Sequence, residues 1–255
     1  AVLRELQAAT AFAPLHTPAA LALIRFAQAQ SPGVPQVACF DTQFHVGLPD
    51  VARVLPIARE LQSQGTQRYG FHGVSLESIV RQLGDALPQR LVIAHLGNGA
   101  SITALKAGLS IDTSMGMTPS GGVIMGTRSG ALDPAILQFI MNSDNISVDE
   151  MLEILNKSSG FLGISGISSD MRDIDKAAAE GNKRAIITQE ILYAGIKKYI
   201  GGYAAIMGGV DVIVFTAGIG ENGPLVREKV MDSLAFLGAK IDLEKNDVRG
   251  KEVDI

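Results

Sequence analysis

Residues 91–101, with the sequence LVIAHLGNGAS, constrain the fold of this chain more than any other part. An apolar run stops at two glycines around an asparagine and then resumes as a second strand-like run. Asn-Gly is the strongest short signal for a two-residue hairpin turn, because both residues accept positive φ angles. Glycines also leave their backbone N–H groups open to close approach by an anion. The segment therefore predicts a hairpin whose tip is either a plain turn or a phosphate site.

A second glycine-rich turn follows an apolar run at residues 210–215 and comes before a helix. Pro224 suits the first turn of that helix and Gly238 its C-terminal cap. The apolar residues recur at helical spacing, at Val226, Val230, Leu234 and Leu237. A strand, a glycine turn and a helix N-terminus together often bind phosphate, although a plain connection has the same pattern. The glycine spacing is not that of the dinucleotide fingerprint, so a mononucleotide is favoured.

Composition bounds the class of protein. The chain has 255 residues, 47% of them hydrophobic, and a formal net charge of −4. This length can bury a core of one or two domains, and the absence of a basic block argues against a nucleic-acid partner. The sequence has no apolar run of bilayer length and no signal-peptide pattern, so we expect no membrane association. Cys39, within an apolar run, is predicted to be a buried free thiol in a reducing, cytoplasmic compartment.

The order of elements predicts a layered α/β domain. We expect a helix at residues 18–30, a strand at 36–44, an antiparallel meander at 91–113 and a buried strand at 210–215. Asp133-Pro134 and the capping box at residues 147–150 predict helix starts, and Gly208-Gly209 ends a long helix. The sequence has no initiator methionine and stops within an extended segment, so both ends are expected to be cut.

Several polar residues are candidates for chemistry. Arg128 lies between two glycines, where a guanidinium serves either as a clamp for phosphate or carboxylate or as a structural tie to a carboxylate. Asp170 and Arg172 begin a helix, where they either cap it or contact a nucleotide. The four histidines, His16, His45, His72 and His95, match no zinc spacing. Two of these four lie beside Pro or Gly turns, where side chains point into clefts.

Taken together, seven motifs resemble those of the acetate kinase family, in the family's order and across nearly the whole chain. They are FDTQFH (40–45), YGFHG (69–73), HLGNGAS (95–101), DTSMG (112–116), GTRSG (126–130), GISSD (166–170) and FTAGIGEN (215–222). The resemblance implies a ribonuclease-H-like α/β domain, a mixed sheet flanked by helices, of the superfamily that includes acetate and sugar kinases, Hsp70 and actin. It implies residues 1–43 as a remnant of the N-terminal domain and 44–255 as the C-terminal nucleotide-binding domain.

The resemblance also implies roles for particular residues. Asp41, His72 and Arg128 are similar to the catalytic residues. Three segments of this chain are similar to those that hold ATP or ADP in the family. They are His95, Leu96, Gly97, Asn98 and Gly99; Asp170, Met171 and Arg172; and Gly218, Ile219, Gly220, Glu221 and Asn222. The pocket for the acyl methyl group is similar to Leu15, Phe71 and Pro119, with His16 beside it.

The activity implied is reversible transfer of the ATP γ-phosphoryl group to acetate with Mg2+, in a homodimer. Three features of the family are not matched here: an N-terminal Asn-Ala-Gly-Ser-Ser-Ser turn, a second arginine that grips the carboxylate and a C-terminal glutamate that binds magnesium. We therefore expect an incomplete form with no metal ligand set of its own. Two alternatives stay open, a kinase for propionate or another short acid and a non-catalytic nucleotide-binding module like actin or Hsp70.

Overall fold

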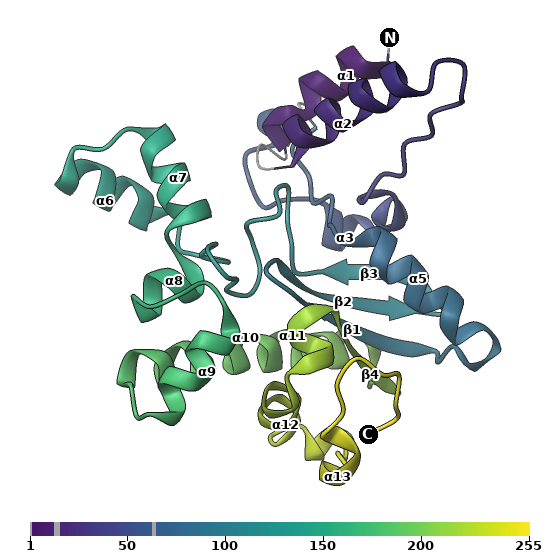
Figure 1. The fold of residues 1–255 in the computed structure, drawn as a ribbon, viewed down its shortest axis with the longest axis vertical. Coiled ribbons are helices and arrows are strands. Elements are labelled where there is room, and N and C mark those ends of the chain that lie inside the picture. The colour runs from purple at the N-terminus through teal and green to yellow at the C-terminus, as the bar shows by residue number, and fades with distance from the viewer. Residues whose placement is uncertain (1, 13–15, 63–64) are drawn as a thin grey trace.

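A computed structural model describes residues 2–12, 16–62 and 65–255 and places a four-stranded sheet at the centre (Figure 1). The strands are β1 (Arg90–Leu96), β2 (Ala100–Lys106), β3 (Leu109–Thr113) and β4 (Val212–Thr216), in the spatial order β3-β2-β1-β4. The first three strands pair antiparallel as a meander, while β4 pairs parallel with β1. The predicted α/β class and the meander are confirmed. The final strand forms where it was predicted, but it is not buried along its length, because only Thr216 is buried and Val212 is 40% exposed.

Helices cover both faces of this sheet because successive side chains of β1 point to opposite faces. Leu91 and Ile93 form a small core with Leu76 of α5 (Gly73–Leu83). Val92, Ala94 and Leu96 belong to the larger core on the other face, together with the long helix α10 (Lys183–Met207). Burying each large aliphatic side chain contributes about 1.5–3 kcal/mol. The alternation along β1 therefore holds α5 and α10 on opposite sides of the strand that leads into the hairpin.

The other helices extend from this core (Figure 1). They are α1 (Val2–Ala8), α2 (Thr17–Gln30), α3 (Asp50–Arg53), α4 (Arg59–Gln62), α6 (Ala135–Asp144), α7 (Val148–Lys157), α8 (Gly160–Ser165), α9 (Met171–Ala179), α11 (Ala217–Asn222), α12 (Pro224–Met231) and α13 (Leu243–Asn246). Short 3-10 helices lie at Ala9–Phe12, Gln43–His45, Gly84–Ala86 and Ala235–Leu237. The pair α1 and α2 lies at one end of the molecule, and α6 with α7 forms an arm at one side. No described helix is long and apolar enough to cross a bilayer.

Most predicted helix ends are present. The Ser147 side chain accepts from the Glu150 backbone, and the Glu150 carboxylate accepts from Ser147 N–H, which completes the capping box. Gly208, with a φ of 74°, caps α10, and Pro224 lies in the first turn of α12. Gly238 caps the 3-10 helix Ala235–Leu237 instead of α12, so that prediction was wrong. Helix α12 ends at Met231, before Leu234 and Leu237, the last two of the apolar residues at helical spacing.

The strand predicted at residues 36–44 is wrong. Residues 35–40 have no regular secondary structure, and Val37 is 85% exposed. Cys39 is exposed too, which contradicts the buried thiol. Strand propensity reports a fit to a half-buried pleated surface, and no described strand edge lies against this segment. The apolar residues therefore stay in an extended, exposed segment.

Both glycine-rich turns differ in detail from the prediction. The hairpin after β1 uses residues 97–99, none with positive φ, and closes with Gly97 N–H donating to the Gly99 carbonyl at 3.0 Å. After β4 the chain enters helix α11 directly instead of an open turn. The left-handed residue at that corner is Ala217, with a φ of 65°. The sequence pattern alone did not predict that a helix begins directly at this corner.

Candidate functional site

The site forms where β1 and β4 end at the same edge of the sheet. Their parallel register pairs His95 with Thr216, so the hairpin after β1 and helix α11 after β4 begin side by side. A Cβ on Gly97 would lie 3.6 Å from the Cβ of Ala217. Ligands of α/β proteins commonly bind at the carboxyl ends of parallel strands. The two glycine-rich segments therefore form one floor.

A loop at residues 125–130 covers this floor from a third direction. Gly126 N–H donates to the Asn98 carbonyl at 3.2 Å, and Ser159 N–H donates to the Thr127 carbonyl at 2.9 Å. Gly160, with a φ of 60°, has no room for a Cβ because the Met125 carbonyl occupies that space. The start of α8 thus holds the loop against the hairpin tip.

Arg128 extends from this loop as a buried cation. The residue is 7% exposed, and its Nη1 donates to the Pro119 carbonyl at 2.6 Å. No carboxylate of the described residues lies within ion-pair distance, and burial lowers the pKa of the guanidinium. Its other terminal nitrogen faces the hairpin, since a Cβ on Gly99 would lie 2.7 Å from Nη2. A buried charge without a partner is costly, so this arrangement fits an anion at Gly99 better than a structural tie.

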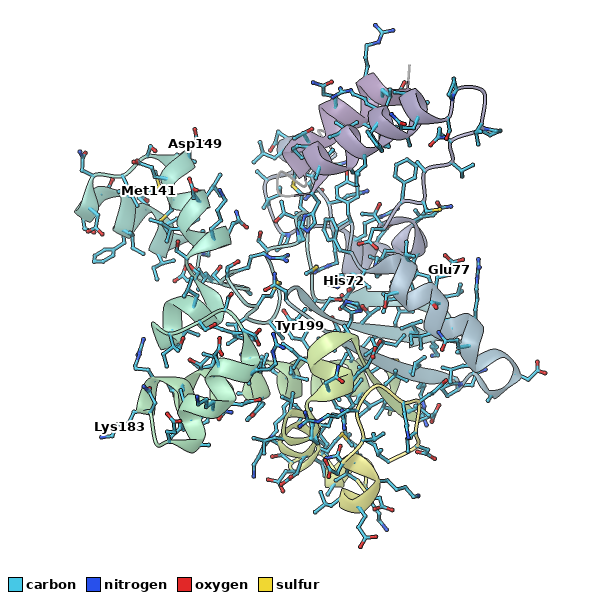
Figure 2. All side chains as sticks on the ribbon, in the orientation of Figure 1. His72, Glu77, Met141, Asp149, Lys183 and Tyr199 are labelled. Atoms are coloured by element: carbon cyan, nitrogen blue, oxygen red, sulfur yellow. The ribbon has the colours of Figure 1, made fainter. Side chains whose placement is uncertain are left out.

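His72, labelled in Figure 2, also approaches this glycine, since a Cβ on Gly99 would lie 3.4 Å from His72 Nε2. It precedes α5 with a left-handed φ of 62°, and its Nδ1 lies 2.9 Å from the Ser101 hydroxyl. The imidazole stacks on His95, with ring centroids 4.1 Å apart. Burial, followed by the charges of His95 and Arg128, lowers the pKa of His72 to about 3. The ring is therefore neutral near pH 7 and can donate or accept one hydrogen bond there.

Asp41 joins the site from the segment before α3. Its Oδ2 accepts from His72 N–H at 2.7 Å, and its backbone carbonyl accepts from Gly73 N–H at 2.8 Å. The carboxylate is exposed and lies at the N-terminus of α5, where the helix dipole favours negative charge. Tertiary structure thus brings His72 and Arg128 together at Gly99, and Asp41 joins them through its bond to the His72 backbone.

The remaining histidines have different surroundings. His95 Nδ1 lies 3.0 Å from the Ser75 hydroxyl, and burial lowers the pKa of its ring. Burial and then the charge of Arg128 lower the pKa of His16, at the start of α2. His45 is 2% exposed and hydrogen-bonded at both ring nitrogens. The described residues contain no group of three or more His, Cys, Asp or Glu arranged to hold a metal ion.

The predicted pair at the start of α9 forms a cap. Asp170 accepts from Arg172 N–H at 2.9 Å, and the two side chains form an ion pair at 2.5 Å. The hydrogen bonds from Arg172 lower the pKa of Asp170 to about 2. The capping interpretation is therefore realised. The Ser169 carbonyl lies 3.0 Å from the Cβ position of Gly126, so the cap also lies next to the hairpin and its covering loop.

Helix α11 is held from both ends. At its start, the Glu221 carboxylate accepts from Ala217 N–H at 3.0 Å. At its end, Arg227 donates to the carbonyls of Gly220 and Glu221 at 2.8 and 2.9 Å, and it also bonds Asn246 of α13. Arg227 is 3% exposed. Sequence analysis missed it, because an arginine in a helix that begins with proline has the pattern of an ordinary surface residue.

The predicted acyl pocket is partly defined. Phe71 is half-buried next to His72, and Pro119 is buried with its carbonyl bound to Arg128. Burial and then the charge of Arg128 lower the pKa of His16, and the charge of Asp41 opposes this shift. Leu15 lies outside the described residues.

Comparison with known proteins places the whole chain in one family. Residues 1–255 match the model described as the Acetokinase family. The acetate kinase of Natranaerobius thermophilus is 48% identical over 260 residues, an alignment that covers 100% of this chain and 65% of that protein. The crystal structure of Porphyromonas gingivalis acetate kinase superposes with a TM-score of 0.90 at 42% identity, covering 99% of this chain and 65% of that one.

A propionate kinase from Francisella tularensis superposes equally well. Its TM-score is 0.92 at 42% identity, with 96% of this chain and 65% of that chain covered. The chain thus spans about two thirds of the length of the relatives that it matches, 65% in each of these comparisons.

Proposed function

The chain belongs to the acetokinase family, and on that premise we propose that it forms the phosphoryl-transfer site of an acetate kinase. The reaction is reversible transfer of the ATP γ-phosphoryl group to acetate, which gives acetyl phosphate and ADP. One observation supports this most strongly. The buried guanidinium of Arg128 has no carboxylate partner among the described residues and faces the bare backbone of Gly99. An arginine held in this way matches the need for a fixed positive charge beside a transferring phosphoryl group.

Catalysis then rests on electrostatics and positioning. Acetate is ionised near neutral pH, since carboxylic acids have a pKa of about 4, so its oxygen attacks without a general base. Arg128 stabilises charge on the equatorial phosphoryl oxygens, and His72, neutral at pH 7, donates a hydrogen bond to the same group. A loose transition state is stabilised mainly by groups of this kind.

We assign Asp41 as the residue that would bind Mg2+. Mg2+ usually binds through one or two carboxylates together with phosphate oxygens and water. The exposed carboxylate of Asp41, next to His72, fits that description. A magnesium ion held by Asp41 would supply positive charge that offsets the charge of the nucleotide phosphates. Asp41 also keeps the N-terminus of α5 in place through its bonds to His72 and Gly73.

The nucleotide is assigned to the hairpin, to the start of α9 and to α11. We propose that residues 95–99 contact the phosphates, because Gly97 and Gly99 leave backbone N–H groups uncovered. Residues 170–172 and 218–222 hold the rest of the nucleotide. The Arg172 side chain, 88% exposed beside its ion pair with Asp170, remains accessible to a ligand. The Ser169 carbonyl, just before the first segment, lies 3.0 Å from the Cβ position of Gly126, and the Cβ of Ala217, just before the second, lies 3.6 Å from that of Gly97.

Acetate is the proposed acceptor, with Phe71, Pro119, His16 and Leu15 forming the pocket for its methyl group. The superposition on a propionate kinase makes propionate the specific alternative. One methylene changes binding by only about 1–3 kcal/mol, so the same kind of site can accept both acids, and we expect them to differ in the rate of the reaction. A non-catalytic nucleotide-binding module would account for the hairpin and α11. A binding module of this kind would not account for the buried charge of Arg128 or for the neutral His72 beside it.

The test is an assay for acyl phosphate, trapped as the hydroxamate, on the protein that contains this chain. It is run with ATP and Mg2+ on acetate and on propionate. We expect turnover with both acids and a higher kcat/KM with acetate. Nucleotide binding without any acyl phosphate would favour the binding module, and a higher kcat/KM with propionate would reassign the substrate.

Three further assignments are proposed. The first divides the chain into an N-terminal remnant, residues 1–43, and a nucleotide-binding domain, residues 44–255. The remote position of α1 and α2 supports this division (Figure 1). The second is a homodimer, which sedimentation equilibrium would test. The third is a cytoplasmic location, which cell fractionation would test.

A further inference from the structure

The peptide unit between Phe71 and His72 is held at both ends by one short segment of chain. Its N–H, on His72, donates to Asp41 Oδ2 at 2.7 Å. Its carbonyl, on Phe71, lies 3.0 Å from His45 Nε2. Asp41 lies just before the 3-10 helix Gln43–His45 and His45 ends it, so one short turn supplies both contacts. The orientation of this peptide plane is therefore set from outside the turn that contains it.

The hydrogen bonds of His45 determine which of its nitrogens carries the proton. A carbonyl only accepts, so Nε2 must bear the hydrogen and donate to Phe71. Nδ1 then accepts from the Ser110 hydroxyl, 2.9 Å away. Burial lowers the pKa of His45, which keeps the ring neutral. His45 is thus a neutral imidazole in the Nε2–H form.

The turn that His45 contacts has little room to adjust. Gly70 has a φ of 71°, and a Cβ there would lie 2.6 Å from the His45 ring and 2.7 Å from Thr113 Cγ2. His72 itself is left-handed, with a φ of 62°. A left-handed non-glycine residue is strained and persists only where its surroundings impose it. The bonds from His45 and Asp41 are what impose it here.

We propose that His45 is a positioning residue for phosphoryl transfer. It fixes the Phe71–His72 peptide plane, so that the His72 imidazole is presented between His95 and Gly99. The role of His72 in turnover rests on the proposed function. The orientation of His72 does not, and it can be tested separately. His45 lies beneath the turn, 2% exposed, and contacts the site only through the Phe71 carbonyl.

Two variants separate the two bonds of His45. In His45→Gln, the amide nitrogen of the new side chain lies where Nε2 was and can still donate to Phe71. In His45→Asn, the shorter side chain reaches Ser110 but not the Phe71 carbonyl. A displacement of about 1 Å at a reacting group costs about 100-fold in rate. We expect His45→Asn to lower kcat by about 30- to 100-fold with nucleotide affinity unchanged within about threefold, and His45→Gln to retain most of kcat.

NMR of the four histidine rings supplies a readout that is independent of activity. The chain has only 4 histidines, so ring signals labelled at 13C and 15N are readily assigned. We expect the Nε2–H form of His45 at pH 7. We also expect the His72 ring signal to move in His45→Asn, because its stacking on His95 changes, and to stay in place in His45→Gln. Thr188→Ala, which removes a buried hydroxyl of α10, is the control for general loss of stability.

The outcomes are distinct. An unchanged His72 signal in His45→Asn, or the Nδ1–H form of His45, would overturn the proposal even if the protein is an acetate kinase. Equal losses of kcat in the Asn, Gln and Thr188→Ala variants would reduce His45 to a structural residue. Should wild-type protein make no acyl phosphate, the proposed function fails while the NMR result still decides the orientation of His72.

Discussion

Arg128 is the residue on which the proposed chemistry depends most. We expect Arg128→Ala to lower kcat by about 100- to 1,000-fold, the usual loss when a fixed donor to a developing charge is removed. Nucleotide affinity should change little, because the guanidinium acts on the transferring group. Steady-state kinetics together with calorimetric titration of ADP measures the two effects. Arg81→Ala, which removes an exposed guanidinium on α5, is the matched control.

The stability of the same variant tests the alternative. Arg128→Ala removes a buried cation that has no carboxylate partner among the described residues but also leaves the Pro119 carbonyl unpaired, so its free energy of unfolding should fall by no more than about 1–3 kcal/mol, the cost of one unpaired buried acceptor. A larger drop, measured by urea denaturation, together with normal turnover would return Arg128 to a structural role.

His72 makes a prediction about pH. Its pKa is about 3 in the folded chain, against an ordinary value of 6.5. Between these values the unfolded state binds a proton that the folded state does not, so stability is lost as the pH falls below 6.5. The slope from one such group is at most about 1.4 kcal/mol per pH unit. Urea unfolding at about pH 7 and about pH 5 should show the loss, and His72→Asn should reduce it; equal slopes in the two proteins would contradict the shifted pKa.

At the scale of elements, the hairpin after β1 depends on Gly99. A Cβ there would lie 2.7 Å from Arg128 Nη2 and 3.4 Å from His72 Nε2. We expect Gly99→Ala to displace the guanidinium and to lower kcat by about tenfold or more. Gly116→Ala is the control, since nothing lies within 4 Å of a Cβ at that position. Comparable kinetics of the two variants would show that the hairpin tip does not face the reacting group.

Arg227 holds α11, α12 and the segment around α13 together. Its guanidinium bonds the carbonyls of Gly220 and Glu221 and both the side chain and the backbone of Asn246. Replacement by Met keeps the length but leaves several buried acceptors unpaired, each worth about 1–3 kcal/mol. We expect Arg227→Met to lower the free energy of unfolding by about 2–4 kcal/mol, measured by urea denaturation. Arg81→Met, an exposed counterpart, should change it by less than about 1 kcal/mol.

At the scale of the whole molecule, nucleotide should stabilise the 255-residue chain. The hairpin, the start of α9 and α11 lie at one edge of the sheet, so a bound nucleotide links segments that are far apart in sequence. A ligand that binds only the folded state adds about 2.7 kcal/mol at about 100 times its dissociation constant. We expect ADP with Mg2+ to raise the unfolding temperature and to give measurable heat of binding. The absence of both effects in a folded sample would exclude a nucleotide site on these elements.

Local signals in the sequence predicted most of the secondary structure. The apolar run of β1, the capping box at Ser147 and the end of α10 at Gly208 were read correctly. The same kind of signal failed at residues 36–44, where strand propensity had no partner strand to pair with. It also failed after β4, where Ala217 takes the left-handed conformation and a helix begins at once.

The candidate site was predictable only as a set of motifs. Sequence order and residue type by themselves determined that Asp41, His72, Arg128 and two glycine-rich segments exist in one chain, and that the chain is an α/β protein. Tertiary structure alone decided that the Asp41 carboxylate binds His72 N–H across 31 positions, that Arg128 is buried without a carboxylate partner among the described residues, and that His72 is neutral. Turns and caps follow from sterics and hydrogen bonds within a few residues, whereas burial, pKa and charge pairing follow from segments that meet only when the chain has folded.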